Sequence, residues 1–152
     1  MSFFEWTPEM SVGLARLDDD HKGLIAIINR LAETCGKPDQ HAVIEQAFRA
    51  LLRYTEVHFG REEAVLNAVH YASLQGHRHQ HHDFIKDILE LRHAFGQAGD
   101  EETQRELLDY LKDWLTNHIM IEDMAYKSAV EHSAIARDAA ERFSSLDIWT
   151  TR

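Results

Sequence analysis

Apolar residues recur at intervals of three and four along most of the chain, which is the pattern of amphipathic helices. The first run shows the pattern in its simplest form, with Leu24, Ile25, Ile28 and Leu31. The whole pattern predicts four long helices, over residues 19–35, 40–68, 72–96 and 101–122. Short connections between consecutive helices favour antiparallel neighbours. We therefore expect an all-α fold, an up-down-up-down four-helix bundle.

The N-terminal segment lies outside this pattern. Residues 1–17 lack a clear period and predict an arm that is anchored to the bundle by apolar side chains, namely Trp6, Val12, Leu14 and Leu17. Asp18-Asp19-Asp20 then offers capping side chains for the first helix. With 152 residues and no low-complexity linker, the chain fits one domain over residues 1–152, with the bundle in residues 18–127.

The C-terminal extension, residues 128–152, predicts one short extra helix over residues 130–146. Its apolar stripe is thin and consists of Ile135, Ala139, Phe143 and Leu146. Two further apolar residues, Ile148 and Trp149, follow near the end of the sequence. We expect this extension either to pack on its own bundle or to bind a second copy or a partner protein through residues 130–152.

Composition and charge narrow the class of protein. The single cysteine, Cys35, cannot form a disulfide within the chain, which fits a reducing compartment and predicts a cytoplasmic protein. We expect no signal peptide and no membrane span, because the sequence has neither a basic-then-apolar leader nor a run of about 18 apolar residues. The formal net charge of −10 repels phosphate backbones and argues against nucleic acid as a partner.

Histidine and carboxylate side chains occur in pairs at helical spacing. His58 and Glu62 are four residues apart, as are His77 and His81, so each pair shares one face of its helix. Apolar neighbours such as Phe59 turn these faces towards the core. Buried imidazoles and carboxylates are costly without partners, and metal cations would satisfy both pairs at once.

Three further residues extend this set. His118 and Asp123 are five residues apart, which places them about 140° apart on a straight helix. We therefore predict a local distortion between residues 119 and 124 that brings Asp123 round to the same side. His21, in the first turn of the first helix, completes the set.

Five imidazoles and two carboxylates are too many ligands for one metal ion and suit two ions that share bridging carboxylates. The set contains no thiolate, which argues against a cysteine-type zinc site or an iron–sulfur cluster. Imidazole with bridging carboxylate suits iron and, less well, manganese, copper or zinc. The sequence lacks His-Glu-x-x-His, and only Glu90-x-x-His93 matches the ferritin-like motif, so neither of these sites is supported.

The motifs resemble those of the hemerythrins, specifically the bacterial hemerythrin-like proteins, over about residues 6–127. The similar segments are Asp18-x-x-His21, His58-Phe59-x-x-Glu62-Glu63, His77-x-x-x-His81-x-x-Phe84 and Trp114-Leu115-x-x-His118-x-x-x-x-Asp123. The resemblance implies a non-heme di-iron centre that binds dioxygen reversibly for carriage, storage or delivery.

The resemblance also implies a role for each ligand. His77, His81 and His118 would hold one iron, and His21 and His58 would hold the other, which keeps an open position. Glu62 and Asp123 would bridge the two irons together with an oxo or hydroxo group. An apolar dioxygen pocket would be formed by Leu24, Phe59, Trp114, Leu115 and Ile119, although core packing alone also explains these five residues.

Two other functions compete with a dioxygen carrier, which we favour. One is a sensor of dioxygen or redox state that signals through the C-terminal extension. The other is a di-iron enzyme of the peroxidase type or one that handles nitric oxide. Helix spacing places no acid or base beside the open iron except the ligands themselves, so we expect a protein that is not an enzyme and has no catalytic residues.

Several polar residues near the ligands are expected to have ordinary roles. Glu63, His79 and His82 point away from the ligand faces. The two histidines are expected to be solvated, and Glu63 to be solvated or to form a salt bridge. Asp18 either caps the first helix or orients a ligand histidine. The other histidines lack a partner at ligand spacing and are expected on the surface.

Overall fold

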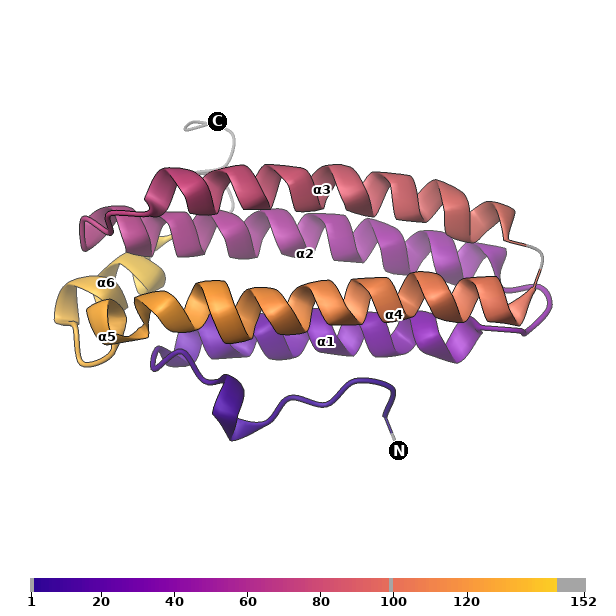
Figure 1. Cartoon of the computed structure of the whole chain (residues 1–152), viewed down its shortest axis with the longest axis horizontal. Coiled ribbons are helices and arrows are strands. Elements are labelled where there is room, and N and C mark those ends of the chain that lie inside the picture. Colours follow the sequence, from indigo (N-terminus) through magenta and orange to yellow (C-terminus); the bar gives the residue numbers. More distant parts are fainter. Residues whose placement is uncertain (1, 99, 145–152) are drawn as a thin grey trace.

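The computed structural model describes residues 2–98 and 100–144, and within these residues every regular element is helical. The long helices are α1 (Ala15–Thr34), α2 (His41–Ala68), α3 (Leu74–Gln97) and α4 (Glu101–Asn117). Figure 1 shows them side by side, with the chain direction alternating from each helix to the next. Contacts join α1 to α2, α2 to α3, α3 to α4 and α4 back to α1. The up-down-up-down bundle predicted from the sequence is confirmed.

The N-terminal arm is held to the bundle by buried apolar side chains and by one carboxylate. Val12, Leu14 and Leu17 are all at most 4 % exposed, whereas Trp6 is half-buried under the ammonium group of Lys22. The prediction that Asp18 caps α1 is wrong, because α1 begins earlier, at Ala15. Asp18 instead accepts hydrogen bonds from the hydroxyl of Ser11 and the backbone N–H of Val12.

A polar layer divides the apolar interior of the bundle in two. Along α1, Leu17 belongs to one apolar cluster and Leu24 to the other, with His21 between them. The same order recurs on α2, where Phe59 and Val65 lie on either side of Glu62. Each helix therefore carries its polar residues at the same level of the bundle, enclosed by hydrocarbon above and below.

The C-terminal extension forms two short helices, where the sequence predicts one helix over residues 130–146. These are α5 (Lys127–Val130) and α6 (Ala134–Arg142), and α6 packs against α1 and α2. The buried side chains of α6 are Ala136 and Ala140, whereas Ile135 is 64 % exposed, so the predicted stripe is wrong at its first position. Leu146, Ile148 and Trp149 lie outside the described residues.

No helix in the described part of the chain combines the length and the apolar character needed to cross a membrane.

Close approach of α1 and α2 depends on a glycine. A Cβ atom placed on Gly23 would lie 2.1 Å from the hydroxyl oxygen of Tyr54, whereas one placed on Gly76 of α3 would meet nothing within 4 Å. Gly23→Ala is expected to lower the free energy of unfolding by about 1–3 kcal/mol, because Tyr54 must move. Gly76→Ala is expected to raise it by about 0.5–1 kcal/mol through helix propensity. Urea unfolding of both variants checks the pair, and equal shifts would contradict the close contact.

Candidate metal centre

The bundle brings the seven predicted ligands to one level. His21 lies on α1, His58 and Glu62 on α2, and His77 and His81 on α3. The other two residues, His118 and Asp123, begin and end the short helix η2 (His118–Asp123), which continues α4. All seven residues are at most 5 % exposed. Five imidazoles and two carboxylates therefore converge in a layer that is closed to bulk water.

The distortion predicted between residues 119 and 124 is a π-helical turn. The six residues of η2 form this wide turn directly after α4. A π-helix closes its hydrogen bonds on the fifth residue rather than the fourth. Because His118 and Asp123 are five residues apart, the wide turn brings both side chains to the same interior layer.

The two carboxylates divide their oxygens between two sets of histidines. Oε1 of Glu62 lies 2.5 Å from Nε2 of His77 and 3.0 Å from Nε2 of His81. Oε2 of Glu62 lies 3.4 Å from Nε2 of His58 and 4.0 Å from Nε2 of His21. Each oxygen of one carboxylate therefore faces a different pair of imidazoles.

Asp123 repeats this division. Its Oδ1 lies 3.1 Å from Nε2 of His77 and 3.2 Å from Nε2 of His118, and its Oδ2 lies 3.2 Å from Nε2 of His21. The donor atoms fall into two groups with all separations under 4.8 Å, Glu62 with His77, His81 and His118, and Glu62 with His21, His58 and Asp123. This arrangement suits two ions that share carboxylates.

The donor atoms of this layer also fit metal ions because many of them have no other partner. Four imidazole nitrogens, Nε2 of His21, His58, His81 and His118, make no hydrogen bond, and neither do the two carboxylate oxygens of Asp123. Buried polar atoms without partners are rare in folded proteins because their desolvation is uncompensated. Cations in the two groups would satisfy all of these atoms at once.

Protons compete with metal ions for the same nitrogens. Burial by itself would lower the pKa of His58, but contacts with Asp20 and Glu62 outweigh burial and raise that pKa to about 10. For His77, the contacts with Asp123 and Glu62 likewise overcome burial and raise the pKa to about 10. Burial would raise the pKa of Glu62, yet the facing imidazoles hold it well below its usual range. Positive charge therefore stabilises the buried layer, and bound metal ions would supply that charge in place of protons.

Known proteins share this sequence and this fold. The chain matches the sequence model of the hemerythrin HHE cation binding domain over residues 12–130. It is 33 % identical over 143 residues to bacteriohemerythrin of Pseudomonas aeruginosa, a match that covers 93 % of this chain and 92 % of that protein. The chain belongs to the hemerythrin family.

Two further similarities extend across most of this hemerythrin domain. The hemerythrin-like protein of Naegleria gruberi is 32 % identical over 127 residues, which cover 84 % of this chain and 93 % of that protein. The crystal structure of a hemerythrin leucine-to-alanine mutant superposes with a TM-score of 0.74 at 26 % identity, covering 86 % of this chain and 99 % of that one. Hemerythrins bind non-heme iron and dioxygen, and the donor set described above is consistent with iron.

Around the predicted ligands, carboxylates contact two of the imidazole rings at Nδ1, the ring nitrogen that faces away from the donor layer. Nδ1 of His58 donates to Asp20 at 3.0 Å, and Asp20 also accepts from the guanidinium group of the buried Arg61. Nδ1 of His81 lies 2.8 Å from Glu63, which is 9 % exposed and also pairs with Arg78. Of the two roles predicted for Glu63, the salt bridge is confirmed and solvation is wrong. Such contacts fix the ring orientation and the tautomer that leaves Nε2 free for a metal.

Tyr126 supports one of the shared carboxylates. Its ring is completely buried, and its hydroxyl donates to Oε2 of Glu62 at 3.0 Å. Burial and the nearby carboxylates of Asp123 and Glu62 raise the pKa of Tyr126 well above its usual value, so the phenol stays a hydrogen-bond donor. Sequence reasoning missed this residue, although its position three residues after Asp123 was a usable signal.

Four of the five residues predicted to line a dioxygen pocket belong to one apolar cluster beside the predicted ligands. Leu24, Phe59, Leu115 and Ile119 are at most 2 % exposed, and Trp114 packs against the same cluster but is only half-buried. The Phe59 ring stacks on His81 with 3.6 Å between ring centroids. Trp114 stacks on His118 with 4.7 Å between centroids. Apolar side chains thus contact the imidazole layer directly.

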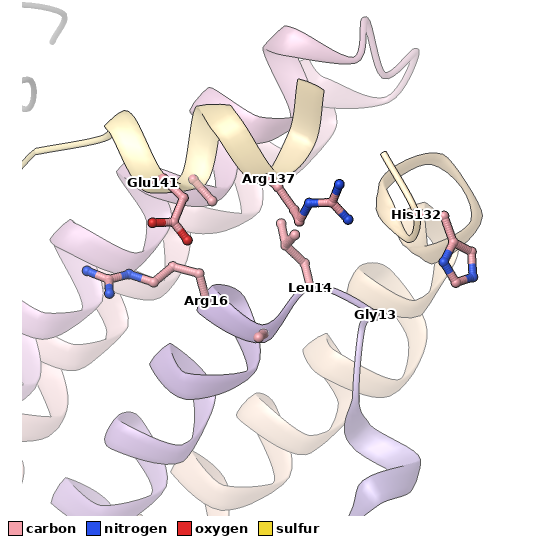
Figure 2. A pocket seen from close by; sticks show the side chains of 8 residues that line it. Gly13, Leu14, Arg16, His132, Arg137 and Glu141 are labelled. Atoms are coloured by element: carbon pink, nitrogen blue, oxygen red, sulfur yellow. The ribbon is translucent and has the colours of Figure 1, made fainter. Parts of the chain in front are cut away.

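Of two surface pockets, one reaches the candidate centre, and only at its edge. One, of about 240 Å³, is lined by Gln80, Trp114, Asn117, His118, Ile121 and Glu122 and touches the outer edge of a single predicted ligand. The other, of about 250 Å³, lies between the start of α1 and α6. Figure 2 shows Arg137 close to Leu14 in this second pocket, with Arg16 and Glu141 on one side of Leu14 and His132 further away on the other. None of its lining residues is a predicted ligand.

The remaining histidines lie where the sequence predicts. His79 is solvent-exposed and 3.5 Å from Asp83, and His82 is also exposed. His41, His70, His93 and His132 are exposed as well. His79, an exposed residue between the predicted ligands His77 and His81 in the sequence, therefore serves as a control for experiments on the centre.

Proposed function

We propose that this hemerythrin binds dioxygen reversibly at a centre of two iron ions held by His21, His58, Glu62, His77, His81, His118 and Asp123. The observation that carries the proposal is the division of the carboxylate oxygens, since each oxygen of Glu62 and of Asp123 faces its own set of imidazoles. One ion would receive three imidazoles and the other only two. The second ion would therefore keep a position for an external ligand.

Iron in such a centre supplies the electrons and the open position that reversible dioxygen binding requires. The chain's own residues contribute orientation and exclusion of water. Asp20 and Glu63 hold the rings of His58 and His81, and Tyr126 holds Glu62 through a hydrogen bond. The apolar side chains beside this layer keep water and anions away, which favours release of the bound gas unchanged over its loss as a reduced product.

Two measurements test this proposal together. Iron per chain is counted after reconstitution under nitrogen, and the optical spectrum of the reduced protein is then recorded before air, in air and after air is removed. We expect two irons per chain and a colour that appears in air and disappears when air is removed. Fewer than two irons, or a spectrum that changes once and does not return, would refute reversible binding at a di-iron centre.

A matched pair of variants tests whether the proposed pocket excludes water. Ile119→Thr places a hydroxyl beside the ligands, where Ile119 is 0 % exposed, and Ile121→Thr makes the same change at a residue that is 63 % exposed. We expect Ile119→Thr, and likewise Leu115→Ala, to speed autoxidation of the oxygenated protein by about tenfold or more, because water gains access to the centre. Ile121→Thr should leave the rate unchanged. Decay of the oxygenated spectrum in air measures all three.

A further inference from the structure

The C-terminal helix α6 is connected to the candidate metal centre through one buried arginine. Ala136 and Ala140 seat α6 in the apolar cluster at the end of the bundle, among side chains of α1 and α2. Where α6 ends, the ring of Phe143 lies over the guanidinium group of Arg61, with 5.6 Å between the guanidinium carbon and the ring centroid. An arginine side chain over an aromatic face is attracted by the ring electrons.

Arg61 is a positive charge in a nearly closed environment. It is 6 % exposed, and its Nε makes no hydrogen bond. Its Nη1 donates to both carboxylate oxygens of Asp20. Burial of a guanidinium group is costly unless other groups compensate for the lost water, and here Asp20 does so on one side and Phe143 on the other.

Asp20 also contacts a predicted metal ligand. The same carboxylate accepts the Nδ1–H of His58, so Arg61 and His58 are bound to one carboxylate at the same time. His58 belongs to the donor group with two imidazoles, the one proposed to keep an open position. The corresponding arginine beside Glu63, Arg78, has a side chain that is 39 % exposed, so the two sides of the centre are supported differently.

We infer that Phe143 and Arg61 are positioning residues, through which the docked C-terminal helix stabilises the ion held by His21 and His58. The inference rests on the proposed di-iron centre. Undocking of α6, or loss of the ring of Phe143, would open Arg61 to water and loosen Asp20, so that His58 no longer presents Nε2 in a fixed direction. The ion on that side would be lost first, while the ion held by His77, His81 and His118 would be affected less.

The test compares iron release from the full-length, iron-loaded protein in the presence of an excess of a ferrous chelator. Changes to the outer partners of metal ligands typically weaken binding about 10- to 100-fold. We expect Phe143→Ala to speed release of the first iron about tenfold and to shift the visible spectrum of the air-oxidised centre. Arg142→Ala is the matched control, because this neighbour at the end of α6 has a side chain that is 80 % exposed and should release iron as the unaltered protein does.

Two further variants separate the ring–guanidinium contact from simple packing. Phe143→Tyr keeps the aromatic face and should restore slow release, whereas Phe143→Leu keeps apolar volume without the ring and should not. If Phe143→Ala fails to fold, as judged by circular dichroism, the leucine variant takes its place. Release within about twofold of the unaltered protein, from either the alanine or the leucine variant with two irons bound, would overturn the inference. An unaltered protein that binds fewer than two irons would refute the proposed centre instead.

Discussion

Glu62→Gln is expected to abolish binding of an iron pair and to leave at most one iron per chain. Its two carboxylate oxygens face different sets of imidazoles, His77 and His81 through Oε1 and His58 and His21 through Oε2. An amide offers one weakly basic oxygen and an N–H₂ group that would point at one of the two ions. Because the loss of an outer partner alone weakens metal sites about 10- to 100-fold, loss of a shared ligand should exceed that range.

Iron per chain after reconstitution and desalting is the decisive measurement for this variant. His79→Ala provides the control, since His79 lies between two predicted ligands in the sequence yet has a side chain that is 80 % exposed. It should retain two irons, whereas His77→Ala should not. A Glu62→Gln protein that still holds two irons and changes colour reversibly in air would refute the bridging role.

Removal of metal is expected to lower the melting temperature by about 8–16 °C. An ion present at about 1,000 times its dissociation constant stabilises the folded state by about 4 kcal/mol. In a domain of this size each kcal/mol shifts the melting temperature by about 2–4 °C. The physical cause is the buried donor layer, in which the four imidazole nitrogens and the Asp123 oxygens make no hydrogen bond.

Thermal unfolding of chelator-treated and reloaded protein, followed by circular dichroism, measures this difference. The Glu62→Gln variant should show a much smaller shift on the same treatment, since it is expected to hold at most one ion. Identical melting curves with and without iron in the unaltered protein would mean that the layer is stable on protons alone. That result would contradict the proposed metal-binding role of the buried donor atoms that make no hydrogen bond.

The sequence predicted the elements that depend on local periodicity. The bounds of α2, α3 and the start of α4 agree with the apolar pattern to within two residues, because each helix has one face that must leave water. The predicted ligands also converge as expected, since the four-residue spacings of His58 with Glu62 and of His77 with His81 fix one shared face for each pair. Even the wide turn that carries Asp123 followed from a spacing that a regular helix cannot accommodate.

Errors occurred where contacts between distant segments compete with local signals. The three aspartates before His21 are of a residue type that commonly caps helices. In the structure, however, Asp18 binds the N-terminal arm and Asp20 binds His58, which is 38 residues away. Glutamate is usually a surface residue, yet α3 places His81 and Arg78 against Glu63. On α6, the large Ile135 faces solvent and the small Ala136 and Ala140 are buried, because the face of α6 that packs on α1 and α2 is the one that carries the two alanines.

By itself, then, the sequence determined the helices, their order and the seven candidate donors. Periodicity gives the helices, and residue spacing gives the shared face of each pair or, for His118 and Asp123, the distorted turn that joins them. The tertiary structure alone decided which groups hold those donors in place. Asp20, Arg61, Glu63 and Tyr126 obtain their roles from helices that meet only in the folded chain. The physical reason is that periodicity specifies the direction of a side chain on its own helix, whereas a partner across the bundle depends on how the helices pack.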